Sequence, residues 1–232
     1  TGTSQVPMNI GRQVTEGITV VLNYTILQKE DMNLNFNMNA RHITSEYRNI
    51  GTAMDQYNKE NSSSNLTRYY DGGSPSDLWA VRSVGIDPGS GREIFLKKDG
   101  TQTFIHDTDD KVVVGNSEPK LEGVIGASFY YKGFSASVNL RYRLGGQIFL
   151  STLYNKVENI SENDLQYNQD KRALYDRWQK TGDVTKFKSI SLTSSTPISS
   201  RFVADENTLS GESISLGYET SAAWLRHVGV SS

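Results

Sequence analysis

The chain has 232 residues, a formal net charge of −2 and no cysteine. Without cysteine there is no disulfide framework and no thiolate metal site, and the small negative charge, with no basic block, argues against a nucleic-acid partner. No apolar run approaches the roughly 20 residues that a membrane helix requires.

The first predicted strand covers residues 17–26, where apolar side chains alternate with small or polar ones. Successive side chains of a strand point to opposite faces, so this pattern makes one face apolar. The run is about as long as a tilted strand that crosses a bilayer. The apolar face carries Ile18, Val20, Leu22, Tyr24 and Ile26.

Residues 31–41 show the clearest alternation in the chain. One face carries Met32, Leu34, Phe36, Met38 and Ala40, and the other carries Asn33, Asn35, Asn37, Asn39 and Arg41. Asparagine has poor intrinsic strand propensity, so a face built of it suits a wet, hydrogen-bonding interior. An apolar face opposite such an interior is typical of a transmembrane β-barrel strand, with lipid outside and the lumen inside.

The pattern recurs in residues 121–131, 134–143 and 213–219. On this reading Arg141 and Arg143 join Arg41 in facing the lumen, where charge must be hydrated or paired. We expect these arginines to pair with lumen carboxylates such as Glu219 or with an internal plug. The alternative is that they line a solute path.

The connections between the predicted strands alternate between short and long. Residues 28–31 and 131–133 form tight turns, whereas 45–120 and 144–209 are long loops. Outer-membrane barrels have this arrangement, with the long loops extracellular. We therefore predict an all-β, antiparallel transmembrane β-barrel segment of about five strands plus the start of a sixth near Val228, with two long extracellular loops.

Both long loops carry predicted structure of their own. Residues 92–104 read as a hairpin with Asp99-Gly100 as its turn. Residues 168–180 read as one short helix that Asn168 or Asp170 caps, with Leu174 and Trp178 on one face. Long loops with internal structure are usually functional.

No catalytic group of residues stands out. The three histidines share no ligand spacing with another histidine or a carboxylate, and no glycine-rich phosphate loop or nucleophile elbow is complete. We therefore expect no enzyme activity, no cofactor and no metal site.

Several longer phrases resemble the SusC/RagA family, which are TonB-dependent outer-membrane transporters of Bacteroidetes. The longest is RYYDGGSPSDLWAVRSVGIDPGSGREIFLKKDG at 68–100, followed by VGNSEPK at 114–120. Residues 142–147, 170–178 and 209–213 are also similar to family stretches. These phrases occur in the family's order and span nearly the whole chain.

The resemblance implies that residues 1–232 are a partial C-terminal portion of a TonB-dependent receptor β-barrel, with the plug domain and the remaining strands absent. It implies residence in a bacterial cell outer membrane, in contact with its lipid. It further implies import of a large nutrient, a glycan or an oligopeptide. The expected partners are a SusD-like surface lipoprotein and TonB, the latter through parts absent from this chain.

The aromatic residues of the loops are the candidate contacts with the substrate or the lid. Tyr70, Trp79 and Trp178 could stack on sugar rings through their flat apolar faces, although such residues more often pack a loop together. Two other classes of protein stay open at this point: a soluble β-sandwich carbohydrate-binding module, and a passive porin or adhesin barrel.

Overall fold

The computed structural model describes residues 9–63, 66–191 and 194–220. In this part the chain is built mainly of antiparallel strands with a few short helices, which confirms the predicted all-β class. None of the described helices has the length and apolar character to cross a membrane. The sixth strand predicted near Val228 lies outside the described residues.

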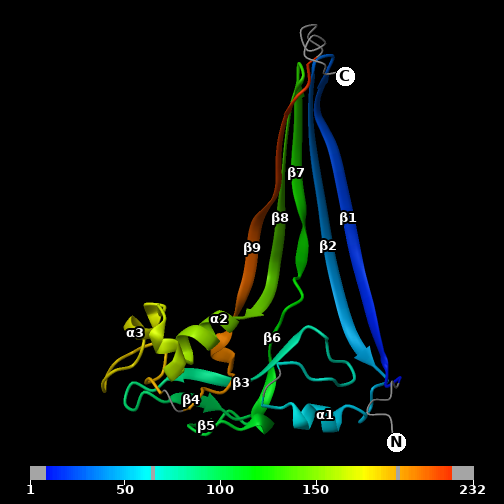
Figure 1. Cartoon of the computed structure of the whole chain (residues 1–232). Coiled ribbons are helices and arrows are strands. Elements are labelled where there is room, and N and C mark those ends of the chain that lie inside the picture. The colour runs from blue at the N-terminus through cyan, green and yellow to red at the C-terminus, as the bar shows by residue number, and fades with distance from the viewer. Residues whose placement is uncertain (1–8, 64–65, 192–193, 221–232) are drawn as a thin grey trace, which may run out of the picture. The chain divides into compact units, whose positions relative to one another are not determined.

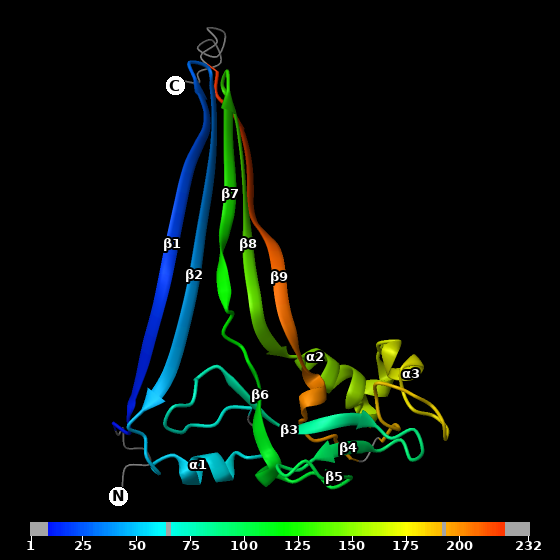
Figure 2. The same cartoon turned by 180° about the vertical axis from the view of Figure 1, so that it is seen from behind.

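The other five predicted strands form one five-stranded sheet (Figure 1 and, from behind, Figure 2). Its order is β1-β2-β7-β8-β9. β1 therefore lies beside β2, and β7 beside β8, as expected for strands that short turns join. The strands are β1 (Arg12–Lys29), β2 (Met32–Arg48), β7 (Leu121–Tyr131), β8 (Phe134–Phe149) and β9 (Val203–Tyr218).

All but one of these strands are longer than predicted. β2 continues from Arg41 to Arg48, and β9 begins at Val203 rather than at residue 213. The added residues are largely polar, as in Asp205-Glu-Asn207. A hydrogen-bonded ladder needs a partner strand and not an apolar face, so the strands extend past the stretch in which apolar residues alternate.

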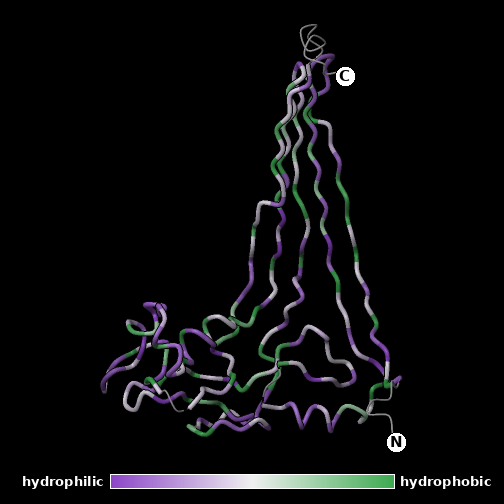
Figure 3. Tube along the Cα trace, in the orientation of Figure 1, coloured by the Kyte–Doolittle hydropathy of each residue, from purple (hydrophilic) through white to green (hydrophobic). Residues whose placement is uncertain are grey.

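The register gives the sheet one polar and one apolar face. Asn37 lies opposite Gly126, which lies opposite Asn139 on the next strand. One position along, Met38, Ile125 and Leu140 align on the other face. Figure 3 shows the resulting alternation of hydrophilic and hydrophobic residues along the strands.

Much of the apolar face is uncovered within the described part of the chain. Val20 is 60% exposed on β1, and Leu216 is 84% exposed on β9. A β-sandwich would bury such residues under a second sheet. These apolar side chains are thus open in the described part of the chain, unlike those of a β-sandwich.

Two-residue turns join neighbouring strands at one end of the sheet. Glu30-Asp31 connects β1 to β2, and Lys132-Gly133 connects β7 to β8. Lys132 and Gly133 both have positive φ, 47° and 90°. This combination belongs to the mirror-image turn whose twist matches that of a hairpin.

The chain divides into two compact units. We call residues 17–43, 119–145 and 206–232 the strand unit, because most of the five-stranded sheet belongs to it. We call residues 1–16, 44–118 and 146–205 the loop unit, because they contain most of both predicted long loops.

The loop unit has a sheet of its own, in the order β5-β4-β3-β6. β4 and β5 pair antiparallel, and the Lys97 N–H donates to the Thr101 carbonyl at 2.9 Å. Gly100 has φ +88°, so the hairpin predicted around Asp99-Gly100 is confirmed. The strands are β3 (Asp77–Ile86), β4 (Glu93–Leu96), β5 (Gln102–Thr103) and β6 (Lys111–Asn116).

The loop unit has a buried core and several short helices. Ala80, Val81 and Phe202 are at most 1% exposed, and a second cluster contains Val157 and Phe187. The α-helices are α1 (Asp55–Glu60), α2 (Ser151–Leu153) and α3 (Arg172–Tyr175), and η2 (Tyr154–Glu158) is a π-helix. The 3-10 helices are η1 (Thr108–Asp110), η3 (Glu162–Gln166) and η4 (Ser200–Phe202).

The helix predicted over residues 168–180 is wrong in length and face. Only α3 is helical, and Leu174 is 60% exposed whereas Arg177 is buried. The Arg177 guanidinium donates to the carbonyls of Val157 and Glu158. Beyond α3 the chain is extended, because the Trp178 N–H donates to the Phe187 carbonyl rather than continuing the helical ladder.

Candidate functional site

The loop unit has a cleft of about 630 Å³, which we call the loop cleft. Tyr70 and Trp79, two of the predicted contact residues, both line it. α1 supplies Asp55 and Lys59, and η1 supplies Asp109. Arg68 also lines it.

The two aromatic rings of the loop cleft touch each other edge to face. The centroids of Tyr70 and Trp79 are 5.3 Å apart, with an interplanar angle of 87°. The guanidinium carbon of Arg68 lies 5.5 Å from the centre of the Trp79 ring, and Arg68 Nη2 donates to the Thr108 carbonyl at 3.1 Å. Arg68 thus holds one face of Trp79 through a cation–π contact.

Tyr70 is held in place by a hydrogen bond and by close packing. Its hydroxyl donates to Asp77 Oδ2 at 3.2 Å, and a Cβ placed on Gly73 would lie only 2.4 Å from its ring. The pKa of Tyr70 is raised by burial and by the charge of Asp77. Tyr70 and Trp79 therefore form a fixed part of the wall of the loop cleft, although Tyr70 stays 36% exposed.

Trp178, the third predicted contact, lies at a different place in the loop unit. Its Nε1 donates to the Pro88 carbonyl at 2.9 Å. Its ring packs directly on Gly91, where an added Cβ would lie 2.4 Å from it. Trp178 thus packs against the turn that follows β3.

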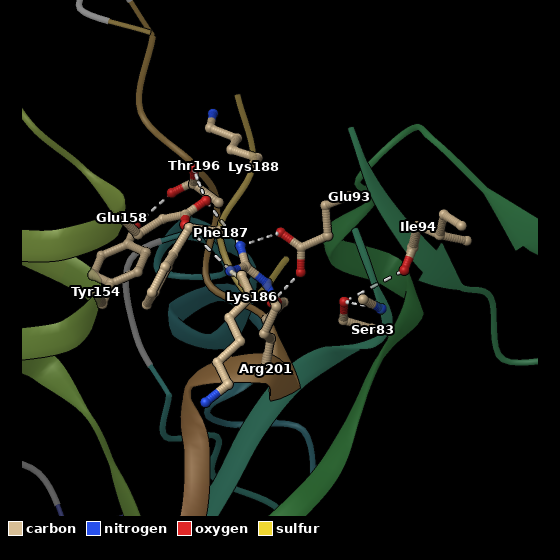
Figure 4. A network of polar contacts seen from close by, with 12 residues as sticks. Ser83, Glu93, Ile94, Tyr154, Glu158, Lys186, Phe187, Lys188, Thr196 and Arg201 are labelled. Atoms are coloured by element: carbon tan, nitrogen blue, oxygen red, sulfur yellow. Dashed lines mark hydrogen bonds and ion pairs between the residues drawn. The ribbon is translucent and has the colours of Figure 1, made fainter. Parts of the chain in front are cut away.

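A buried ion network holds the loop unit together (Figure 4). Arg201 Nη2 lies 3.0 Å from Glu93 Oε2 and 2.8 Å from Glu158 Oε1. The side chain of Arg201 is 12% exposed, that of Glu93 3% and that of Glu158 0%. Burial alone would lower the pKa of Arg201, but the hydrogen bonds to the two carboxylates and their charges together outweigh burial and raise it.

Two buried hydroxyls complete this network. Ser199 Oγ donates to Glu93 Oε1 at 2.5 Å, and Thr196 Oγ1 donates to Glu158 Oε1 at 2.9 Å. The network joins the segment before β9 to β4 and to η2. The sequence gives no periodic signal for it, because its members come from distant loop positions.

The arginines of the polar face are all paired within the strand unit. Arg41 forms an ion pair with Glu122, and Arg141 with Glu212 at 2.6 Å. Arg143 lies 3.3 Å from Glu206 and 3.6 Å from Glu122. The predicted partner, Glu219, forms none of these pairs; its backbone N–H donates to the Gly133 carbonyl instead.

The asparagines of the same face also bond across strands. Thr25 Oγ1 donates to Asn35 Oδ1 at 2.9 Å, and the Val124 N–H donates to Asn39 Oδ1 at 3.0 Å. Asn37 shares its row with Gly126, and Asn33 Oδ1 has no hydrogen-bond partner in the described part of the chain. The polar face is therefore a cross-strand network of amides and ion pairs.

Among the described residues, no three histidine or acidic side chains are placed to hold a metal ion. No model of a known protein family matches the chain, and no curated protein matches it.

Solved structures do match it. A structure of the RagAB peptide transporter has a TM-score of 0.70 and 20% sequence identity over 90% of this chain. The RagAB peptide importer in its "closed-closed" state gives the same values, and its "open-open" state gives a TM-score of 0.68. This chain covers only 22–23% of the length of those chains. The likeness shows a shared fold.

Proposed function

We propose that residues 1–232 form a partial C-terminal portion of the β-barrel of a TonB-dependent transporter of the SusC/RagA type. The observation that carries this proposal is the match of 90% of the chain, at a TM-score of 0.70, to a structure of a peptide transporter. The family-like phrases, from residues 68–100 to 209–213, support it independently. The plug domain and the remaining strands would belong to the rest of the polypeptide.

The two faces of the five-stranded sheet support a place in the outer membrane. The apolar face would meet lipid, and the polar face would meet the lumen, as in other transmembrane barrels. Val20 and Leu216 are exposed here, and burying such side chains in lipid is favourable by roughly 25 cal/mol per Å² of apolar area. A soluble β-sandwich would leave no such face open.

The proposed cargo is an oligopeptide rather than a glycan. The matching structures are described as peptide transporters and importers. In the loop cleft, Arg68 covers a face of Trp79, which leaves less of that ring open to a sugar. The work of the protein is then binding and translocation, not catalysis.

The proposed partners follow from the same family resemblance. A SusD-like surface lipoprotein would cover the extracellular side, and TonB would supply energy through parts beyond this chain. The loop unit, with the loop cleft and Trp178, would lie on the extracellular side. Tyr70, Trp79 and Trp178 remain candidates for contact with the substrate or the lid.

Uptake by living cells tests the proposal. We would delete the gene in the source bacterium and measure entry of a fluorescent oligopeptide and of a fluorescent oligosaccharide, with and without a proton uncoupler. The proposal predicts that peptide uptake is lost on deletion and also under the uncoupler. Uptake that depends on the gene but survives the uncoupler would indicate a passive porin, and uptake unchanged by deletion would contradict a transport role.

A further inference from the structure

The two long loops, residues 45–120 and 144–209, share one buried core. Val81 of the first loop and Ser199 of the second form a parallel β-bridge. Val81 is 1% exposed, and Ser199 and Phe202 are 0% exposed. A core built from both loops cannot be divided without exposing apolar side chains to water, which is unfavourable.

The buried ion network also joins one loop to the other (Figure 4). Glu93 belongs to the first loop, whereas Ser199 and Arg201 belong to the second. Arg201 Nη2 lies 3.0 Å from Glu93 Oε2, and Ser199 Oγ donates to Glu93 Oε1 at 2.5 Å. Moving the loops apart would take the cation away from the Glu93 carboxylate, which is 3% exposed. A buried charge without its partner is strongly destabilising.

A third set of contacts between the loops involves the turn after β3. The Gly182 N–H donates to the Pro88 carbonyl at 2.8 Å, and Trp178 Nε1 donates to the same carbonyl at 2.9 Å. The Ser189 N–H donates to the Gly91 carbonyl at 3.1 Å, and the Trp178 ring packs on Gly91. The second loop thus holds this turn of the first loop from two sides.

We infer that the two long loops act as one rigid body during transport and that neither opens away from the other. Access to the extracellular side is then controlled by a part of the transporter outside these two loops. Trp178 is a positioning residue that fixes one loop on the other. This inference rests on the proposed function, since it assigns the loops a role in the transport cycle.

The kind of contact between the loops favours a fixed pair over two separate gates. Segments that move during function usually have few buried contacts and many exposed hydrogen bonds. The contacts between these loops include a buried ion pair and a shared core instead. Opening one loop from the other would break both at once.

A disulfide between the loops tests the inference in the source bacterium. Gly89→Cys and Thr181→Cys are combined in the full transporter, because Thr181 Oγ1 donates to the Gly89 carbonyl at 3.4 Å. The atoms nearest to a Cβ placed on Gly89 are those of the Asp87 carboxylate, at 3.5 Å or more, so a cysteine fits there. The oxidised double variant should import a fluorescent oligopeptide as fast as either single variant does. Uptake that is lost on oxidation and restored by a reductant would overturn the inference.

A distance measurement needs neither the disulfide nor uptake. Spin labels on Lys98→Cys and Lys180→Cys, one exposed position on each loop, report the separation of the loops in the intact transporter in detergent. We expect one narrow distance distribution that is the same with and without the oligopeptide. A second distance, or a shift when the peptide is added, would overturn the inference.

A pair of variants of the second loop tests the role of Trp178 in the same labelled protein. Trp178→Ala removes the ring that packs on Gly91 and should broaden the distance distribution. Leu174→Ala is the control, because the Leu174 side chain is 60% exposed, and it should leave the width unchanged. Equal widths in the two variants would overturn the role of Trp178.

The outcomes separate this inference from the proposed function. A disulfide that stops uptake, in a double variant that imports the peptide when reduced, would overturn the rigid pair and leave the transporter standing. A wild type that imports no oligopeptide would contradict the proposed function, whereas the distance distribution would still decide whether the loops stay together.

Discussion

Tyr142 lies across Gly123 on the neighbouring strand, and the two residues face each other directly in the register of β7 and β8. The hydroxyl of Tyr142 reaches past Gly123 and donates to the Asn39 carbonyl on β2 at 2.9 Å. The ring is only 6% exposed. Because Gly123 has no side chain, one tyrosine joins three strands.

Gly123→Ala should destabilise the sheet by about 1–3 kcal/mol, the usual cost of overpacking. The new Cβ would lie 1.9 Å from the Asn39 carbonyl oxygen and 2.8 Å from the Tyr142 hydroxyl, and a backbone carbonyl cannot turn away. The measurement is the unfolding temperature of the intact transporter in detergent. Gly211→Ala on β9 is the control, since nothing lies within 4 Å of its Cβ; equal shifts in both variants would contradict the account.

Arg201→Met should destabilise the loop unit by about 3–5 kcal/mol, because it leaves two buried carboxylates without their cation. Glu93 and Glu158 are 3% and 0% exposed. Limited proteolysis should show faster cleavage within the loop unit. Lys156→Met breaks a pair whose lysine is 65% exposed and should cost at most about 1 kcal/mol. Matching cleavage rates in the two variants would show that the network is not a stabilising element.

An arginine should be tolerated on one face of β8 and not on the other. Val138→Arg places a charge on the proposed lipid face, at a cost of about 2–4 kcal/mol near the bilayer centre. Ser137→Arg, one residue earlier, places it on the polar face and should cost little. The amount of heat-resistant folded protein in outer-membrane extracts measures both. Equal tolerance would mean that lipid does not cover the apolar face.

The loop unit should become more stable between about pH 8 and pH 10 because of Lys111. Burial, followed by the charge of Arg68, lowers the pKa of Lys111 from 10.5 to about 8. Between these two values the unfolded chain binds more protons than the folded one, so the free energy of unfolding rises with pH.

Proteolysis rates measured across this range, corrected with an unfolded substrate, check the pH effect. Lys111→Met removes the titrating group, so its rate should lose the dependence on pH. A wild type that is cut faster as the pH rises, or a Lys111→Met variant that behaves like wild type, would contradict the assignment.

The five-stranded sheet could be predicted because each of its strands has one polar and one apolar face. In β2, for example, Asn35 lies on the polar face and the next residue, Phe36, on the apolar face, so the sequence alternates. Most ends of the strands other than β7 could not be predicted, because residues such as Glu46 and Asp205 pair through their backbones without an apolar face.

The site was predictable only in part, for a related reason. Tyr70 and Trp79 stood out as loop aromatics, and the structure brings them together, but Trp178 packs on Gly91 instead. Arg201 and its carboxylates come from segments far apart in the sequence, and no local pattern connects them. The ion pairs of Arg41 and Arg143 with Glu122 depend on the register of β2, β7 and β8, which one strand alone does not fix.

The most direct test of the account is the intact mass of the native polypeptide, extracted in detergent from the membranes of its source, together with whatever co-purifies with it. We predict an outer-membrane species several times larger than 25.8 kDa, with a surface lipoprotein attached. A soluble species of 25.8 kDa, absent from the membrane fraction, would contradict the transporter and restore the soluble binding module.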